Sequence, residues 1–193
     1  SAASDVYKRQ VQWLRDRMKF FKKAPETERI VRSLNTNNDI YLVPAFTGLG
    51  APYWNANARG VLSGITRDTS PKEIIRATIE AVAYQTYDLF EAMKHDGLRP
   101  KLVKVDGGMV MNNWFSQFLS DVVNVNVLRP KVQETTALGA AFMAGLHIGV
   151  YKSLKDISKK WSLDRKFKPK MRNQLRNALV KGWSTAIKRA LIV

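Results

Sequence analysis

The chain has 193 residues, of which 45% are apolar, so it can form a packed core and comprises one domain or one domain with an appendage. Its net charge is +16, and it contains two histidines and no cysteine, which excludes disulfides and cysteine chemistry and argues against a histidine-rich metal site. No uncharged apolar run is long enough to span a membrane, and no signal-peptide pattern opens the sequence, so we expect a cytoplasmic protein with no membrane partner.

The excess positive charge lies at the two ends of the chain. Residues 39–150 carry ten basic and ten acidic side chains, whereas residues 151–193 carry thirteen basic and two acidic ones. Nucleic-acid-binding proteins usually gather their cations on one face, with aromatic or polar contact groups between them. Here the C-terminal cations alternate with apolar helix positions, as on a solvated helix face. We therefore do not expect nucleic acid as the main partner, although a non-catalytic basic nucleic-acid-binding module stays an alternative.

Apolar periodicity and turn residues predict the elements of the first sixty-six residues. Phe46, Tyr53 and Trp54 lie in the longest predicted loop, which is therefore either functional or a cover for the core. In chain order we expect a helix over 11–23, a polar turn over 35–39, a strand over 40–43, a loop over 45–60 and a strand over 61–66.

A helix with a complete start signal follows. Ser70 suits the N-cap, Pro71 the first helical position, and Glu73 completes a capping box. The apolar positions of residues 71–94 spread over a wide face, so this helix is predicted to lie at the centre of the core.

The segment with the clearest chemical meaning is the turn at Gly107 and Gly108. It joins a predicted strand over 102–105 to a predicted helix over 114–123. Glycine lets a ligand approach the main chain, and a helix start offers free N–H groups. Asn112 could present its amide to a purine or a ribose. The residues alone leave two readings open, a nucleotide site or a plain strand-to-helix connection.

Beyond this turn we expect a strand over 125–128, a helix over 134–150 and a final amphipathic helix over 172–191. Small residues dominate the helix over 134–150, which predicts close backbone approach to a neighbouring element. The last helix is predicted to pack on the domain surface, and membrane-surface binding is the alternative. Strands that alternate with helices give an α/β fold with about four strands.

Several segments together resemble the glycerol kinases of the FGGY carbohydrate kinase family. The resemblance covers roughly residues 11–183, and its motifs occur in the family's order. The matching segments are 11–16, 43–54 with 58–60, 60–65 with 73–74 and 77–80, 105–109 with Asn112 and Asn113, and 134–141.

The resemblance implies an actin-like, ribonuclease-H-like domain, the C-terminal one of a two-domain enzyme. It assigns residues 1–10 to an unrelated or artefactual segment, 11–150 to the partial nucleotide-binding domain, and 151–193 to a basic helical extension packed on that domain. It also implies that the first strands of the domain, the N-terminal domain and the catalytic aspartate lie upstream of Val11. No catalytic residue is therefore expected in this chain, and the chain alone should be inactive.

The family's nucleotide contacts match Gln12, Gly108 and Asn112 of this sequence. A further glycine of the family pattern is Lys8 here, which we do not interpret as functional. Asp106 could be a metal ligand or a base, but a structural role is favoured, and no residue is assigned to a metal.

The implied reaction converts ATP and glycerol to ADP and glycerol 3-phosphate with Mg²⁺. Another FGGY polyol or sugar kinase is an alternative. The implied partners are ATP or ADP, glycerol and the missing N-terminal domain. The oligomeric state stays open, a homo-oligomer included.

Overall fold

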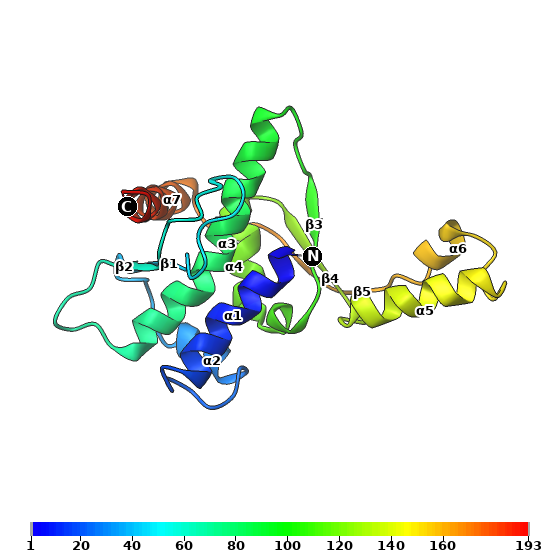
Figure 1. The fold of residues 1–193 in the computed structure, drawn as a ribbon, viewed down its shortest axis with the longest axis horizontal. Coiled ribbons are helices and arrows are strands. Elements are labelled where there is room, and N and C mark those ends of the chain that lie inside the picture. The colour runs from blue at the N-terminus through cyan, green and yellow to red at the C-terminus, as the bar shows by residue number, and fades with distance from the viewer. Residues whose placement is uncertain (1, 193) are drawn as a thin grey trace.

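The computed structural model describes residues 2–192, and the side chains of residues 9–192 (Figure 1). In chain order its elements are α1 (Ala2–Asp16), α2 (Glu26–Arg32), β1 (Tyr41–Val43), β2 (Val61–Ser63), α3 (Pro71–His95), β3 (Leu102–Lys104), a 3-10 turn η1 (Gly108–Met111), α4 (Asn113–Val123), β4 (Asn126–Pro130), α5 (Thr135–His147), α6 (Leu154–Ser158), β5 (Leu163–Phe167) and α7 (Asn173–Ala190).

Two small sheets flank a group of helices. β1 pairs with β2 in antiparallel register, and a second sheet has the order β3-β4-β5. β3 and β4 are parallel and joined through η1 and α4, whereas β5 runs antiparallel to β4. A parallel pair needs such a crossover connection. The predicted α/β character is confirmed, and the crossover places η1 at the end of β3.

Helix α3 occupies the centre of the molecule, as its wide apolar face predicts. Its capping box is complete, because the Ser70 side chain accepts from the first turn and the Glu73 side chain accepts from the Ser70 backbone. α3 packs against α1, α2, α4 and β1. The turn η1 packs against α4, which itself packs on α3.

A buried ion pair lies on α3. Arg76 Nε donates to Glu80 Oε1 at 2.7 Å, and Glu80 is fully buried. The Tyr84 hydroxyl donates to the other carboxylate oxygen at 3.1 Å, and Arg76 Nη1 donates to the Leu34 carbonyl at 2.6 Å. These bonds tie α3 to the turn that follows α2. A buried charge of this kind depends strongly on its partner.

Helix α7 packs across β1 and β2 and contacts α4. Its Trp183 is almost fully buried, and the ring stacks on Tyr84 with centroids 5.3 Å apart. The Trp183 Nε1 donates to Asp88 Oδ2 at 2.8 Å. The predicted surface packing of the last helix thus includes an aromatic anchor in the core.

Asp88 gives the fold a pH-dependent stability. Burial raises the pKa of Asp88 to about 6, although hydrogen bonds from Trp183 and Tyr53 act in the opposite direction. The folded chain therefore holds this proton more tightly than the unfolded chain, in which the pKa is about 4. The contribution of Asp88 to stability is present at low pH and falls as the pH rises from about 4 to about 6.

We expect Asp88→Asn to raise the free energy of unfolding at pH 7 by about 1–2 kcal/mol and to leave it unchanged at pH 4. Asparagine keeps an acceptor oxygen for Trp183 and removes the titration. Urea unfolding at both pH values measures this, with the exposed Asp96→Asn as the control variant. An equal shift at both pH values would show that the proton on Asp88 is not responsible.

Four elements were not predicted, namely α2, η1, α6 and β5. The helices are short, and the strand β5 is mostly polar and exposed. Residues 151–193 were predicted to form a helical extension, but the strand β5 also lies within them. A single helix, α1, spans the predicted boundary at residue 10.

Helix α5 extends away from the rest of the molecule together with α6 (Figure 1). Only Gly145 of α5 is buried, and a Cβ added at Gly139 would meet no atom within 4 Å. A Cβ added at Gly145 would meet the Tyr151 ring at 2.7 Å, so the predicted close approach is confirmed at Gly145 and is wrong for Gly139. Small residues indicate that close approach is allowed, but they do not show which element approaches.

The free edge of β3 and the exposed apolar side chains near α5 predict that the chain self-associates. β3 has one strand partner in the described residues, and Met143, Ile148 and Val150 are exposed on and after α5. Unpaired strand edges and contiguous apolar surface favour association. We expect analytical ultracentrifugation to show concentration-dependent oligomers, which Met143→Glu with Ile148→Glu reduces. A monodisperse parent chain would contradict this.

Within residues 2–192, no helix combines the length and the apolar character that a membrane crossing requires.

Candidate functional site

The site is built around the turn that follows β3. Gly107 has φ 82° and ψ 175°, a conformation that side chains with a Cβ rarely adopt. Its N–H donates to the Gln133 carbonyl at 3.1 Å, which fixes the end of β3 against the segment before α5. η1 then begins at Gly108. A Cβ added to Gly108 would meet no atom within 4 Å, so this position faces open space.

Asn112 connects this turn to α4 and to α2. Its Oδ1 accepts from the Phe115 N–H at 2.9 Å, which makes Asn112 the N-cap of α4. Its Nδ2 donates to the Thr27 hydroxyl at 3.4 Å. The side chain therefore has a fixed orientation, and α2 lies next to η1 although the two are about eighty residues apart in the sequence.

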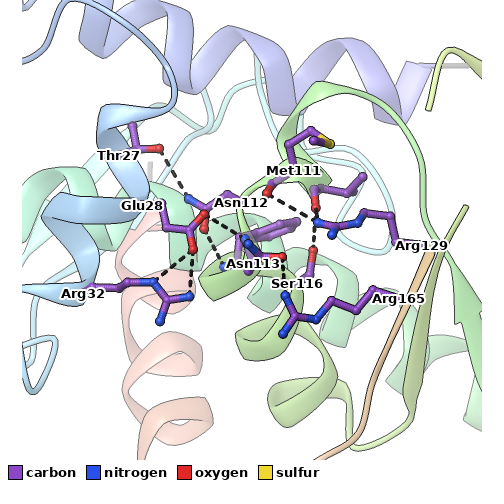
Figure 2. Close-up of polar contacts among 11 residues, drawn as sticks. Thr27, Glu28, Arg32, Met111, Asn112, Asn113, Ser116, Arg129 and Arg165 are labelled. Carbon is purple, nitrogen blue, oxygen red and sulfur yellow. Dashed lines mark hydrogen bonds and ion pairs between the residues drawn. The ribbon is translucent and has the colours of Figure 1, made fainter. Parts of the chain in front are cut away.

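Glu28 joins the same elements through a charge (Figure 2). Its Oε2 accepts from the Asn113 N–H at 3.0 Å, and its Oε1 accepts from Arg32 at 2.7 Å. Burial acts to raise the pKa of Glu28, but the hydrogen bonds from Arg32 and Asn113 outweigh it, so the pKa lies below its ordinary value. The ionised carboxylate holds the N-terminus of α4, where a negative charge is favourable.

On the other side, Arg129 supports the carbonyl end of η1 (Figure 2). This buried guanidinium donates to the Val110 carbonyl at 2.8 Å, and Ser116 donates to the same oxygen at 2.9 Å. Asp164 pairs with Arg129 at 2.7 Å. The turn is thus fixed from the sheet as well as from α2.

A cavity of about 300 Å³ lies between α1, the start of α2 and η1. The three residues assigned to nucleotide contact, Gln12, Gly108 and Asn112, all line it. Its other lining residues are Val11, Arg15, Ala24, Pro25, Thr27, Glu28, Ile79, Met109 and Met111. The structure therefore brings together positions that lie about one hundred residues apart in the sequence.

The lining combines apolar walls with a few polar groups, which suits a small ligand that has both apolar and polar parts. Aliphatic and methionine side chains form most of the walls, and a few polar groups interrupt them. Sites for small molecules and cofactors combine these features at comparable volumes. Gln12 and Arg15 line the cavity from α1, and Asn112 lines it from the end of η1. The backbone at Gly108 leaves room for a ligand to approach.

Asp106 does not line this cavity. Its carboxylate accepts a hydrogen bond from the Thr135 hydroxyl, which links the end of β3 to the start of α5. This contact supports the structural role that the sequence favoured. Among the described residues, no three acidic or histidine side chains gather closely enough to hold a metal ion.

The sequence did not reveal the wall formed by Thr27 and Glu28. α2 is only seven residues long and follows Pro25, so its apolar periodicity is too short to recognise. The acid–base spacing of Glu28 and Arg32, four residues apart, was the available signal, because it favours a helix turn.

Comparison with known proteins identifies the family of the chain. The model of the FGGY family of carbohydrate kinases, C-terminal domain, matches residues 4–148. The chain belongs to this family. Glycerol kinase 1 of Pseudomonas aeruginosa is 52% identical over 179 residues, which are 93% of this chain and 36% of that protein. Glycerol kinase of Alkaliphilus oremlandii is 50% identical over 182 residues, 94% of this chain and 36% of that protein. The FGGY chain thus spans about 36% of the length of these curated relatives.

Solved structures confirm the fold. The crystal structure of Plasmodium falciparum glycerol kinase with ADP matches with a TM-score of 0.85 and 33% identity, covering 97% of this chain and 37% of that one. A ligand-bound xylulose kinase from Lactobacillus acidophilus matches with a TM-score of 0.73 at 23% identity, which supports the fold alone. The predicted FGGY C-terminal domain fold is confirmed.

Proposed function

We propose that this chain is the nucleotide-binding C-terminal part of a glycerol kinase. The observation that carries the proposal is the cavity in which Gln12, Gly108 and Asn112 meet. Relatives at 52% and 50% identity are named glycerol kinases, and a structural match is a glycerol kinase with ADP. The reaction proposed for the whole enzyme transfers the γ-phosphoryl group of ATP to glycerol, which gives glycerol 3-phosphate and ADP.

The chain would contribute binding and orientation to this reaction. Phosphoryl transfer depends on positioning and on charge stabilisation more than on covalent chemistry by the protein. The apolar walls would enclose the adenine, and the Asn112 amide and Gln12 would bond to its polar edge or to the ribose. The fixed turn at Gly107 would hold the backbone of Gly108 in a position where an adenosine can lie against it.

Magnesium would neutralise phosphate charge in the whole enzyme, but this chain provides no cluster for it among the described residues. The ion usually keeps several waters and binds through substrate phosphates with one or two carboxylates. We therefore assign no step to a metal held by this chain, and no residue of the chain acts as the catalytic base in the proposal.

Two measurements test the two parts of this proposal. Isothermal titration calorimetry of the 193-residue chain should show saturable binding of ADP and ATP at one site. A coupled assay with ATP and glycerol should show no turnover by the same preparation. Absence of nucleotide binding would overturn the first part, and glycerol-dependent release of ADP would overturn the second.

The acceptor requires a separate comparison, because the FGGY family includes sugar kinases. We expect the longer enzyme that contains this chain to prefer glycerol over xylulose and gluconate at equal concentrations. Product identification by mass spectrometry would decide this, and a preference for a sugar would assign the chain to another branch of the family.

A further inference from the structure

A second and larger cavity, of about 610 Å³, lies between α4, β5 and α7, and it shares no lining residue with the nucleotide cavity. We call it the basic groove. Its floor contains Trp114, Phe118 and Phe167, and its cations are Arg32, Arg76, Arg165, Lys166, Lys168 and Lys170. Asp121 is its one acidic lining residue. Neither the family match nor the proposed function assigns a role to this groove.

Four of the six cations have no carboxylate partner among the described residues. Arg32 pairs with Glu28, and Arg76 pairs with Glu80. Arg165 and the three lysines form no ion pair in the part of the chain that the structure describes. These four exposed cations line the same cavity and lie within six residues of one another in the sequence, so they give the groove a positive potential.

The acidic residues of this region are engaged elsewhere. Asp121 Oδ1 accepts from the backbone N–H of Lys170 at 2.6 Å and of Met171 at 3.2 Å, and from Gln117 Nε2 at 3.0 Å. The carboxylate therefore holds the loop after β5 and does not bond to a lysine ammonium group. Asp164, on β5 itself, pairs with Arg129. Arg165 and the three lysines of the groove can therefore bind an anionic ligand without breaking an ion pair of the chain.

Neutral groups hold the backbone of Lys168 and the side chain of Arg165 in place. Gln117 Nε2 donates to the Lys168 carbonyl at 2.8 Å, so α4 fixes the backbone that carries the lysines. Arg165 Nη1 donates to Asn113 Oδ1 at 3.0 Å, a contact seen in Figure 2. The floor is rigid as well, because Trp114 stacks on Phe118 with centroids 5.0 Å apart and lies under the Arg76 guanidinium.

We propose that the basic groove binds a small polyvalent anion of the phosphate class. Guanidinium and ammonium groups are the usual protein ligands of phosphate, and charge-assisted hydrogen bonds are the strong ones. The hollow shape favours a small phosphorylated molecule over an extended nucleic-acid strand. The groove is separate from the nucleotide cavity, and Asn113 lies between the two, with its backbone on Glu28 and its side chain on Arg165.

The test is a titration of the 193-residue chain with pyrophosphate, in which tryptophan fluorescence reports binding. Trp114 lines the groove, so a saturable change is expected, and Trp114→Phe should remove it. Arg165→Gln with Lys168→Gln should weaken binding by about ten-fold or more, because two charge-assisted contacts are lost. Lys181→Gln with Lys188→Gln removes the same charge from α7 outside the groove and should change binding less than about two-fold.

A further variant separates this site from the nucleotide cavity. Gly108→Val, which narrows that cavity, should leave pyrophosphate binding unchanged. The proposal would be overturned if the groove variant and the α7 control variant weakened pyrophosphate binding equally. It would also be overturned if fluorescence showed no saturable change up to about 10 mM pyrophosphate. Tighter binding of a single-stranded oligonucleotide than of pyrophosphate would also overturn it, in favour of a nucleic-acid surface.

Discussion

Gly108→Val is expected to weaken ADP binding by about thirty-fold or more while leaving the fold intact, which corresponds to about 2 kcal/mol of binding free energy. A side chain at Gly108 meets no protein atom within 4 Å, so the variant causes no clash in the empty chain. The same position lines the candidate nucleotide cavity, so the added methyl groups would occupy the space of the ligand. Calorimetric titration with ADP measures the loss, and urea unfolding checks the stability.

Gly139→Val is the matched control for this substitution. Gly139 also faces open space, but it lies on α5 and outside the cavity. We expect this variant to bind ADP as the parent does. If Gly108→Val bound ADP within about two-fold of the parent, the ligand would not approach the backbone at η1.

The second large effect concerns stability. Glu80→Gln is expected to lower the free energy of unfolding by about 3–5 kcal/mol, because it leaves the Arg76 guanidinium buried without its counter-charge. Glu80 is fully buried, and it also accepts from Tyr84. A loss of this size is a large part of the stability of a typical domain. Urea unfolding followed by circular dichroism measures it.

Two further variants show whether the unpaired charge is the cause. Arg76→Met with Glu80→Leu removes both charges and should recover most of the lost stability. Glu91→Gln breaks the exposed pair with Lys94 and should cost less than about 1 kcal/mol. If the double variant were as unstable as Glu80→Gln, packing and hydrogen bonding around Tyr84 would account for the effect.

Local signals in the sequence predicted the elements that carry the site. Ser70, Pro71 and Glu73 specify the start of α3 by contacts within one turn. Gly107 and Gly108 predicted a strand-to-helix turn, and the turn is present with the positive φ at Gly107. Gln12, Gly108 and Asn112 came from family resemblance, and the structure places all three at one cavity, while their contact with a nucleotide stays a prediction.

Long-range features could not be read in the same way. Glu28 meets Asn113 at a separation of 85 residues, and Arg165 meets Asn113 at 52. No local pattern encodes such pairs, so the contacts of α4 with α2 and with β5 were not predicted. β5 was missed because Arg165 and Lys166 interrupt its apolar pattern at an exposed strand.

The central claim is that the cavity between α1, α2 and η1 binds a nucleotide, and hydrogen–deuterium exchange with and without ADP tests it most directly. Backbone exchange reports protection of each segment separately. We predict that ADP slows exchange in residues 11–15, 24–28 and 108–112, which line the cavity. Protection confined to residues 165–170, with no change at 108–112, would place the nucleotide in the basic groove and contradict the assignment.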